Sequence, residues 1–185
     1  MRFITLIILL MLGGCATTNI NKEDVPYNQP SSKKFSEYKY VFIKPLTIES
    51  EFKDSWNNQE ALTTIENNLF QNMLPVFKNL SEFSFYDASR SEKTLIIEPH
   101  IEKLKSVSKG VRSSLGLLFL GAGSLAGSSA VILKISYIDA KTKEIIASPA
   151  FYQHASAIGA SFSQNDKDML HRISELASFY ASDNF

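Results

Sequence analysis

Cysteine is almost absent from this sequence, because the 185 residues contain only Cys15. From residue 16 onward there is no thiol, which excludes disulfides, a cysteine nucleophile and cysteine metal ligands from that part of the chain. An excess of positive charge is also lacking, since 19 basic residues balance 19 acidic ones. Nucleic-acid binding requires a basic excess, so we expect no nucleic-acid partner. Stability must come from the hydrophobic core of one domain of ordinary size.

The amino terminus lacks a hydrophobic run long enough to span a membrane. Its apolar stretch, Phe3 to Leu12, follows Arg2 and has roughly ten residues, whereas a spanning helix needs about 20. A short apolar run behind a positive charge is typical of a secretory signal peptide. We therefore predict that residues 1–14 are a signal peptide that is cleaved on export.

The predicted signal ends in Leu12, Gly13, Gly14 and Cys15. This motif resembles the lipobox of bacterial lipoproteins, in which an aliphatic and two small residues precede a cysteine that receives diacylglycerol. The resemblance implies a covalent lipid on Cys15, palmitate included, that attaches the protein to a membrane. In such lipoproteins an aspartate after the cysteine favours the inner membrane, so Ala16 implies the outer membrane, with the domain facing the periplasm. The alternative is an ordinary secretory signal with a chance cysteine.

Composition divides the remaining chain into a tether and a domain. Residues 15–37 are polar, with too few apolar side chains to offset the entropy of ordering, so we predict a lipidated tether. Residues 38–185 are expected to form one domain with a Gly-rich connection at 110–128. We expect no residue before Tyr40 to belong to the ordered core.

Hydrophobic periodicity predicts the elements of that domain. Helices are expected around residues 62–77 and from Ser163, with Asp166 completing a capping box, to Tyr180. Strands are expected at residues 40–46, 83–86, 95–107, 129–138 and 144–152, the last two joined by the turn Asp139 to Lys143. The expected fold is a single α+β domain, a mixed or mainly antiparallel sheet of about five strands with two amphipathic helices on one face.

Residues 113–133 allow two interpretations, because they carry no charge and include Leu117, Leu118, Phe119 and Leu120. Their length would allow a transmembrane helix. Glycines and serines lower the hydrophobicity, however, and the last residues fit the strand from Ser129. We favour a Gly-rich hairpin connection, while insertion of 113–128 into a membrane, or contact of Leu117 to Leu120 with a membrane or partner, stays open.

This stretch matches two functional motifs only in part, one for dinucleotide binding and one for serine hydrolases. Gly121, Gly123 and Gly127 resemble a dinucleotide-binding fingerprint, but a strand follows where a helix is needed. Ser124 has alanines in place of the glycines of a hydrolase elbow, and again no helix follows. We therefore predict no catalytic residue and no cofactor other than the lipid on Cys15.

Other candidate sites have simpler structural explanations. Asp166, Asp168 and His171 could hold a metal on one helix, but acidic residues near a helix start favour the helix dipole, so we predict no metal site. The aromatic group Phe83, Phe85 and Tyr86 could line a ligand groove, although such side chains are more often core or rim.

From the lipobox to the strand ending Tyr137, Ile138, Asp139 and the closing helix, the chain resembles uncharacterised small outer-membrane lipoprotein families of bacteria. In those families the turn after the aspartate usually reads threonine then glycine, whereas Lys143 follows Thr142 here. The resemblance implies a small mixed α/β domain without an assigned activity.

The leading hypothesis is a non-enzymatic binding or assembly component of the cell envelope, attached to the membrane by its lipid and bound to an envelope protein. The second hypothesis is an oligomeric subunit whose segment 113–128 enters the membrane, and the third is an enzyme. The oligomeric state stays open.

Overall fold

The structure, a computed structural model, describes residues 28–50, 56–105, 129–155 and 162–185. It shows one α+β domain in which two helices pack on an open, mixed seven-stranded sheet, so the predicted fold class is confirmed with more strands than expected. The strands are β1 (Tyr40–Ile43), β2 (Thr47–Ile48), β3 (Leu80–Glu82), β4 (Thr94–Lys105), β5 (Ser129–Asp139), β6 (Ile145–Ala147) and β7 (Ala150–Ala155). The helices are α2 (Trp56–Met73) and α4 (Phe162–Asp183), with short 3-10 helices η2 (Phe35–Glu37), η4 (Phe83–Phe85) and η5 (Ala88–Lys93).

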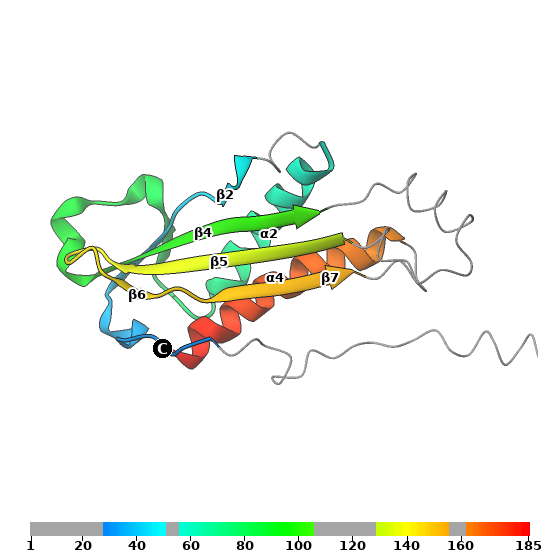
Figure 1. Cartoon of the computed structure of the whole chain (residues 1–185). Helices are drawn as coiled ribbons and strands as arrows, with labels where there is room; N and C mark the ends of the chain where they lie inside the picture. The colour runs from blue at the N-terminus through cyan, green and yellow to red at the C-terminus, as the bar shows by residue number, and fades with distance from the viewer. Residues whose placement is uncertain (1–27, 51–55, 106–128, 156–161) are drawn as a thin grey trace, which may run out of the picture.

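The sheet has the order β3-β1-β4-β5-β6, with β2 also beside β4 and β7 also beside β5. β1 is parallel to β3 and β4, whereas β5 is antiparallel to β4, β6 and β7. In Figure 1 the strands lie in front of both helices, which cover the far face. One face of the sheet is therefore packed and the other is open.

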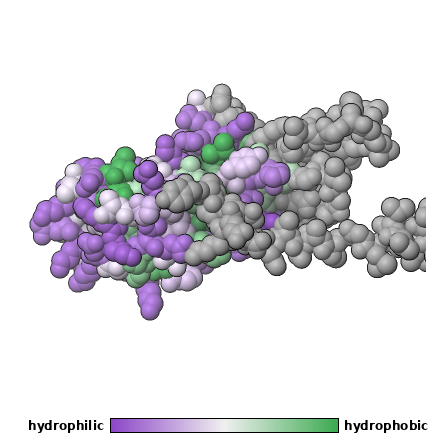
Figure 2. Space-filling model, turned by 60° about the horizontal axis from the view of Figure 1, so that its bottom comes forward, coloured by the Kyte–Doolittle hydropathy of each residue, from purple (hydrophilic) through white to green (hydrophobic). Residues whose placement is uncertain are grey.

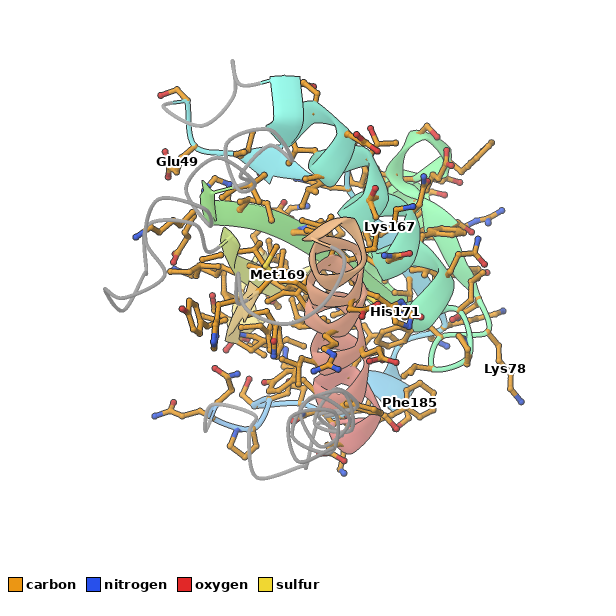
Figure 3. The ribbon with its side chains drawn as sticks, turned by 90° about the vertical axis from the view of Figure 1, so that its right-hand side faces the viewer. Glu49, Lys78, Lys167, Met169, His171 and Phe185 are labelled. Carbon is orange, nitrogen blue, oxygen red and sulfur yellow. The ribbon has the colours of Figure 1, made fainter. Side chains whose placement is uncertain are left out.

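Both helices bury the apolar stripes that their sequences predict. Ile65, Leu69 and Met73 of α2 are buried, and α4 buries Met169, Leu170, Ile173, Leu176, Ala177 and Tyr180. These residues share one core with alternate residues of β5, namely Val131, Leu133, Ile135 and Tyr137. Figure 3 shows α2 and α4 side by side on the same side of the sheet, with Met169 directed toward the strands.

Two prolines interrupt the sheet between β1 and β2. Lys44 N donates to Ile97 O and Glu49 N donates to Ile101 O, so Pro99 of β4 faces the gap between these bonds. Proline has no N–H to donate, and Pro45 lies opposite in the same gap. The strand predicted over residues 40–46 therefore ends early, at Ile43, as β1, and the separate strand β2 begins only at Thr47.

Two further strand predictions need correction. The return strand predicted for residues 144–152 is divided into β6 and β7 by Ser148 and Pro149. The strand predicted at residues 83–86 is the 3-10 helix η4, and the strand lies just before it, as β3. Tyr86 packs edge-on against Phe42, with ring centroids 5.6 Å apart, so these aromatic residues cover one end of the open face instead of extending the sheet.

The polar segment before β1 is part of the domain, which corrects the predicted tether boundary at residue 37. We call residues 28–37 the N-terminal strap. Its Phe35 has no exposed surface and stacks on Tyr137, with ring centroids 4.6 Å apart. Phe35 N donates to Asn184 O, so the strap lies beside the carboxyl terminus, which is marked in Figure 1. One buried aromatic side chain provides the apolar contact that the average composition of the segment conceals.

Among the described residues no helix is long and apolar enough to cross a membrane. Figure 2 shows one side of the molecule, where hydrophilic residues predominate and hydrophobic ones form small separate patches.

Candidate functional site

The residues that the sequence singles out for lipid and membrane contact lie outside the described parts of the chain. These residues are the lipobox Leu12, Gly13, Gly14 and Cys15, and the apolar group Leu117, Leu118, Phe119 and Leu120. Ser124 and the glycines of the partial dinucleotide-binding motif, Gly121, Gly123 and Gly127, also lie outside the described residues. The functional geometry that the structure does show concerns other residues.

The three residues of the discounted metal cluster are only partly described. His171 is exposed, and its Nε2 lies 3.3 Å from Glu175 Oε1, one helical turn further along α4. The side chain of Asp166 is outside the described set. Within the described residues, no group of three or more His, Cys, Asp or Glu side chains has the spacing of a metal site.

A cleft of about 530 Å³ opens between α2 and the chain segments at the end of β1 and the start of η4. Its size is within the range of small-ligand pockets. It is lined by Ile43, Lys44, Pro45, Leu46, Glu66, Asn67, Leu69, Phe70, Gln71, Glu82, Phe83, Ser84 and Pro99. The cleft lies at the break between β1 and β2, where Pro45 and Pro99 both line it.

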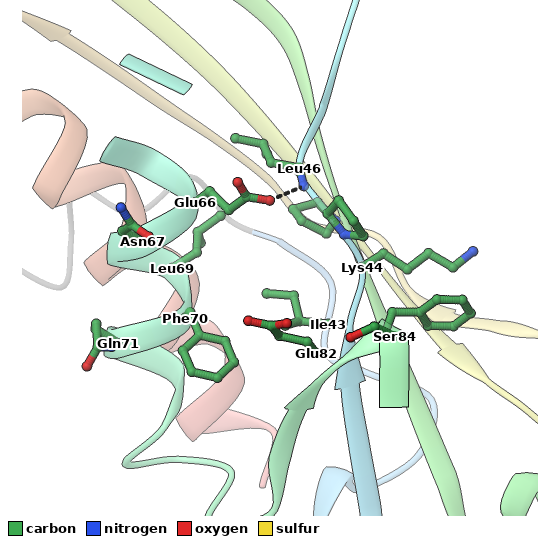
Figure 4. A pocket seen from close by; sticks show the side chains of 13 residues that line it. Ile43, Lys44, Leu46, Glu66, Asn67, Leu69, Phe70, Gln71, Glu82 and Ser84 are labelled. Carbon is green, nitrogen blue, oxygen red and sulfur yellow. Dashed lines mark hydrogen bonds between the residues drawn. The ribbon is translucent and has the colours of Figure 1, made fainter. Parts of the chain in front are cut away.

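The cleft combines an apolar wall with negative charge at its rim. Leu46, Phe70 and Phe83 are half-buried in the wall, and the carboxylates of Glu66 and Glu82 are exposed. Glu66 Oε1 accepts a hydrogen bond from Leu46 N at 2.9 Å, which ties the segment after β1 to α2, as Figure 4 shows. This arrangement suits an apolar group that carries a positive charge.

The one lysine in the cleft lining is already engaged. Lys44 Nζ lies 5.0 Å from the ring centre of Phe83 and forms an ion pair with Glu98 on the open face of the sheet. Its charge is therefore largely balanced by Glu98. Of the aromatic group Phe83, Phe85 and Tyr86, only Phe83 lines the cleft, and Phe85 is 72% exposed outside it.

A second polar centre, around Asp139, fastens the N-terminal strap to the turn after β5. Asp139 Oδ2 accepts hydrogen bonds from Lys33 Nζ at 2.8 Å and from Tyr38 OH at 3.1 Å. Asp139 Oδ1 accepts from the backbone N–H groups of Lys141 at 2.9 Å and Thr142 at 3.1 Å. We call this group the Asp139 clasp. The sequence marks Asp139 only as a turn residue, because its side-chain partners Lys33 and Tyr38 are about a hundred residues away.

The clasp perturbs the pKa values of its members in consistent directions. Burial alone would raise the pKa of Asp139, but the bonds from Lys33, the Thr142 amide and Tyr38 outweigh it and lower the pKa to about 2. The bond to Asp139 raises the pKa of Lys33, and burial raises the pKa of Tyr38. The clasp therefore holds an ionised carboxylate against a protonated lysine, which is a structural tie and not a poised acid–base pair.

His100 is also used structurally. Its Nδ1 lies 2.8 Å from Thr47 Oγ1, and its Nε2 lies 3.2 Å from Glu49 Oε1. These contacts hold the short strand β2 on β4.

Comparison with known proteins finds distant structural likenesses. No protein-family model matches the chain, and no curated protein matches it. The PelC dodecamer from Paraburkholderia phytofirmans is similar at a TM-score of 0.48 and 8% identity, covering 82% of this chain and 94% of that one. A hypothetical protein from Chlamydia trachomatis has a TM-score of 0.47 and 11% identity, covering 79% and 99%. A DUF330 protein from Xanthomonas campestris has a TM-score of 0.45 and 8% identity, covering 74% and 79%. At these scores the likenesses carry no information on partners or activity.

Proposed function

We propose that the protein is a lipid-anchored, non-enzymatic component of the bacterial outer membrane whose domain binds a protein partner. The observation that carries the anchor is Cys15, the single cysteine, which directly follows a short apolar run and Gly13–Gly14. Two or three acyl chains on one cysteine would hold the protein at the membrane effectively permanently.

The described domain begins close to the proposed anchor. Asn28 is the first described residue, so 13 peptide units separate it from Cys15. Such a length reaches at most about 45 Å, less than the tether through residue 37 would allow. The partner is therefore expected to lie close to the membrane surface.

The cleft between α2 and Pro45 is the proposed binding surface. Its wall of Phe70 and Phe83 would receive an apolar side chain, and Glu66 and Glu82 would attract a basic residue beside it. A protein segment that presents an aromatic or aliphatic residue next to a lysine or arginine has this chemistry.

The anchor is tested by fractionating cells that produce the Cys15→Ser variant. The expected result is loss of the protein from the outer-membrane fraction and its recovery as soluble periplasmic protein. Equal amounts of wild type and variant in the membrane fraction would contradict the anchor.

The cleft is tested in intact envelopes with a photo-crosslinking amino acid at Asn67, on the cleft, and at Lys141, on the distant turn, as the control. We expect a discrete crosslinked product from position 67 alone, and its loss in the double variant Glu66→Gln, Glu82→Gln. A product that persists in that variant, or that also forms from position 141, would refute the cleft.

Insertion of residues 113–128 into the membrane stays an alternative prediction, because those residues lie outside the described chain. Its test is resistance of the lipid-free Cys15→Ser protein to alkaline carbonate extraction. Such resistance would favour a membrane-inserting subunit over a binding domain.

A further inference from the structure

The outer edge of β7 presents backbone groups that the described part of the chain leaves without a partner strand. β7 pairs with β5 on one side only. At its start, the side chain of Asn28 pairs with both backbone groups of Ala150: Asn28 Nδ2 donates to Ala150 O at 3.1 Å, and Ala150 N donates to Asn28 Oδ1 at 3.1 Å. The N–H and C=O of Ala150 therefore face away from β5.

The outward direction of the Ala150 backbone groups determines which way the backbone groups of the following residues point. In an antiparallel pair, the backbone groups of alternate residues face the partner strand and the solvent side in turn. The pairing of β7 with β5 runs without a register shift from Ala150 to Ala155. The N–H and C=O of Tyr152 and His154 therefore face outward, as those of Ala150 do.

Natural sheets protect such edges with charge, short strands or coverage, and other edges of this sheet are protected. β3 and β6 have three residues each, and β6 is covered where Ser32 N donates to Ile146 O at 2.9 Å. β7 has six residues, Ala-Phe-Tyr-Gln-His-Ala, and none of them is Asp, Glu, Lys or Arg. It is the longest open edge among the described strands.

We propose that this edge pairs with β7 of a second copy of the chain, antiparallel, about a two-fold axis at Gln153. In that register Tyr152 of each copy lies opposite His154 of the other. The backbone N–H and C=O of Tyr152 in one copy then form hydrogen bonds with the C=O and N–H of His154 in the other, which gives four hydrogen bonds across the two-fold axis. β7 contains no Asp, Glu, Lys or Arg side chain that would oppose a like charge in the second copy. The Asn28 side chain limits the ladder to these two residues.

The side chains of the edge fit the same register. Tyr152 is 51% exposed on the open face of the sheet, and its ring stacks on that of His154 with centroids 5.8 Å apart. Across the two-fold axis, the Tyr152 ring of one copy faces the His154 ring of the other. Cross-strand aromatic pairs of this kind stabilise antiparallel sheets. The two seven-stranded sheets become one continuous sheet in the dimer.

Gln153 provides a direct test, because its backbone groups face β5 and it would form a non-hydrogen-bonded pair with its symmetry mate. Cα atoms in such pairs are about 4.5 Å apart, within the range of disulfides. In the Cys15→Ser protein, Gln153→Cys adds the only thiol. We expect mild oxidation to give mainly disulfide-linked dimer, whereas Lys141→Cys, exposed on the distant turn, gives little.

Backbone involvement is tested by adding His154→Pro, which removes an outward N–H without removing a hydrogen bond to β5. It should abolish the crosslink, and the matched variant His154→Ala should retain it; circular dichroism checks that both fold. Absence of dimer in Gln153→Cys, or equal crosslinking of Lys141→Cys, would overturn the proposal. A crosslink that forms only after residues 16–27 are deleted would also overturn it, by showing that the chain covers its own edge.

Discussion

Lys143 has a backbone conformation that normally belongs to glycine. Its φ is 62°, in the left-handed region, where a side chain crowds the following carbonyl. A lysine in this conformation is therefore a local cost to stability, because its Cβ causes the crowding that glycine would avoid. Lys143 N donates to Asp139 O at 2.8 Å, which keeps the strained turn closed.

Lys143→Gly should therefore stabilise the domain by about 1 kcal/mol. Lys143→Ala retains the crowding Cβ and should give no comparable gain. Chemical denaturation of both variants measures the difference, and equal stability of the two would show that the conformation at 143 is not strained.

Asp139 should make stability depend on pH at acid values. Its pKa is lowered to about 2 in the folded protein, below its ordinary value of 3.8. The ionised clasp therefore stabilises the fold above about pH 4, and this contribution is lost as the pH falls toward 2. A shift of this size corresponds to about 2 kcal/mol.

We expect Asp139→Asn to be less stable than wild type at pH 7. The difference between their free energies of unfolding should become smaller toward pH 2, as measured by urea unfolding at several pH values. A difference in free energy of unfolding that does not change with pH would mean that the Lys33–Asp139 ion pair contributes little to stability.

At the scale of elements, α4 was predictable and β3 was not. The six apolar residues of α4 recur at helical spacing, and all six are buried, because a helix on one face of a sheet needs only a local stripe. The edge strand β3 and helix η4 depend on distant contacts: Leu80 is buried against the core, and Tyr86 is placed by Phe42. The cleft was not predictable for the same reason, since Pro45 and Pro99 become neighbours only in the sheet.

The packing of α4 leads to a prediction about the stability of variants on its two faces. Ile173 and Leu176 have no exposed surface, so alanine at either position should cost about 2 to 5 kcal/mol. His171→Ala, on the exposed side of the same helix, removes only the contact with Glu175 and should cost about 0.5 kcal/mol or less. Thermal or urea unfolding compares the three variants, and a similar loss at His171 would contradict the assigned packing face.

At the scale of the whole molecule, the N-terminal strap changes where the domain begins. Its composition predicted a tether, yet Phe35 lies in the core and Lys33 in the clasp, contacts that a polar average cannot reveal. A chain that begins at Asn28 should fold like the full-length protein. A chain that begins at Lys39 loses the Phe35 ring, whose removal alone costs about 3 to 5 kcal/mol, and should be poorly folded or aggregated.

Size-exclusion chromatography and amide hydrogen exchange compare these two truncated chains. Equal solubility and equal protection of β5 in both would show that the strap is dispensable. The comparison also determines which truncation is suitable for testing membrane insertion, because aggregation of the shorter chain would imitate membrane association.

The most direct test of the proposed lipid anchor is the intact mass of the protein purified from the cell envelope, combined with sequencing of its amino-terminal peptide by mass spectrometry. The expected product begins at Cys15 and carries the added mass of diacylglycerol with an amide-linked acyl chain, or of diacylglycerol alone. A full-length chain that retains Met1, or a chain cleaved elsewhere with an unmodified Cys15, would contradict the lipid anchor.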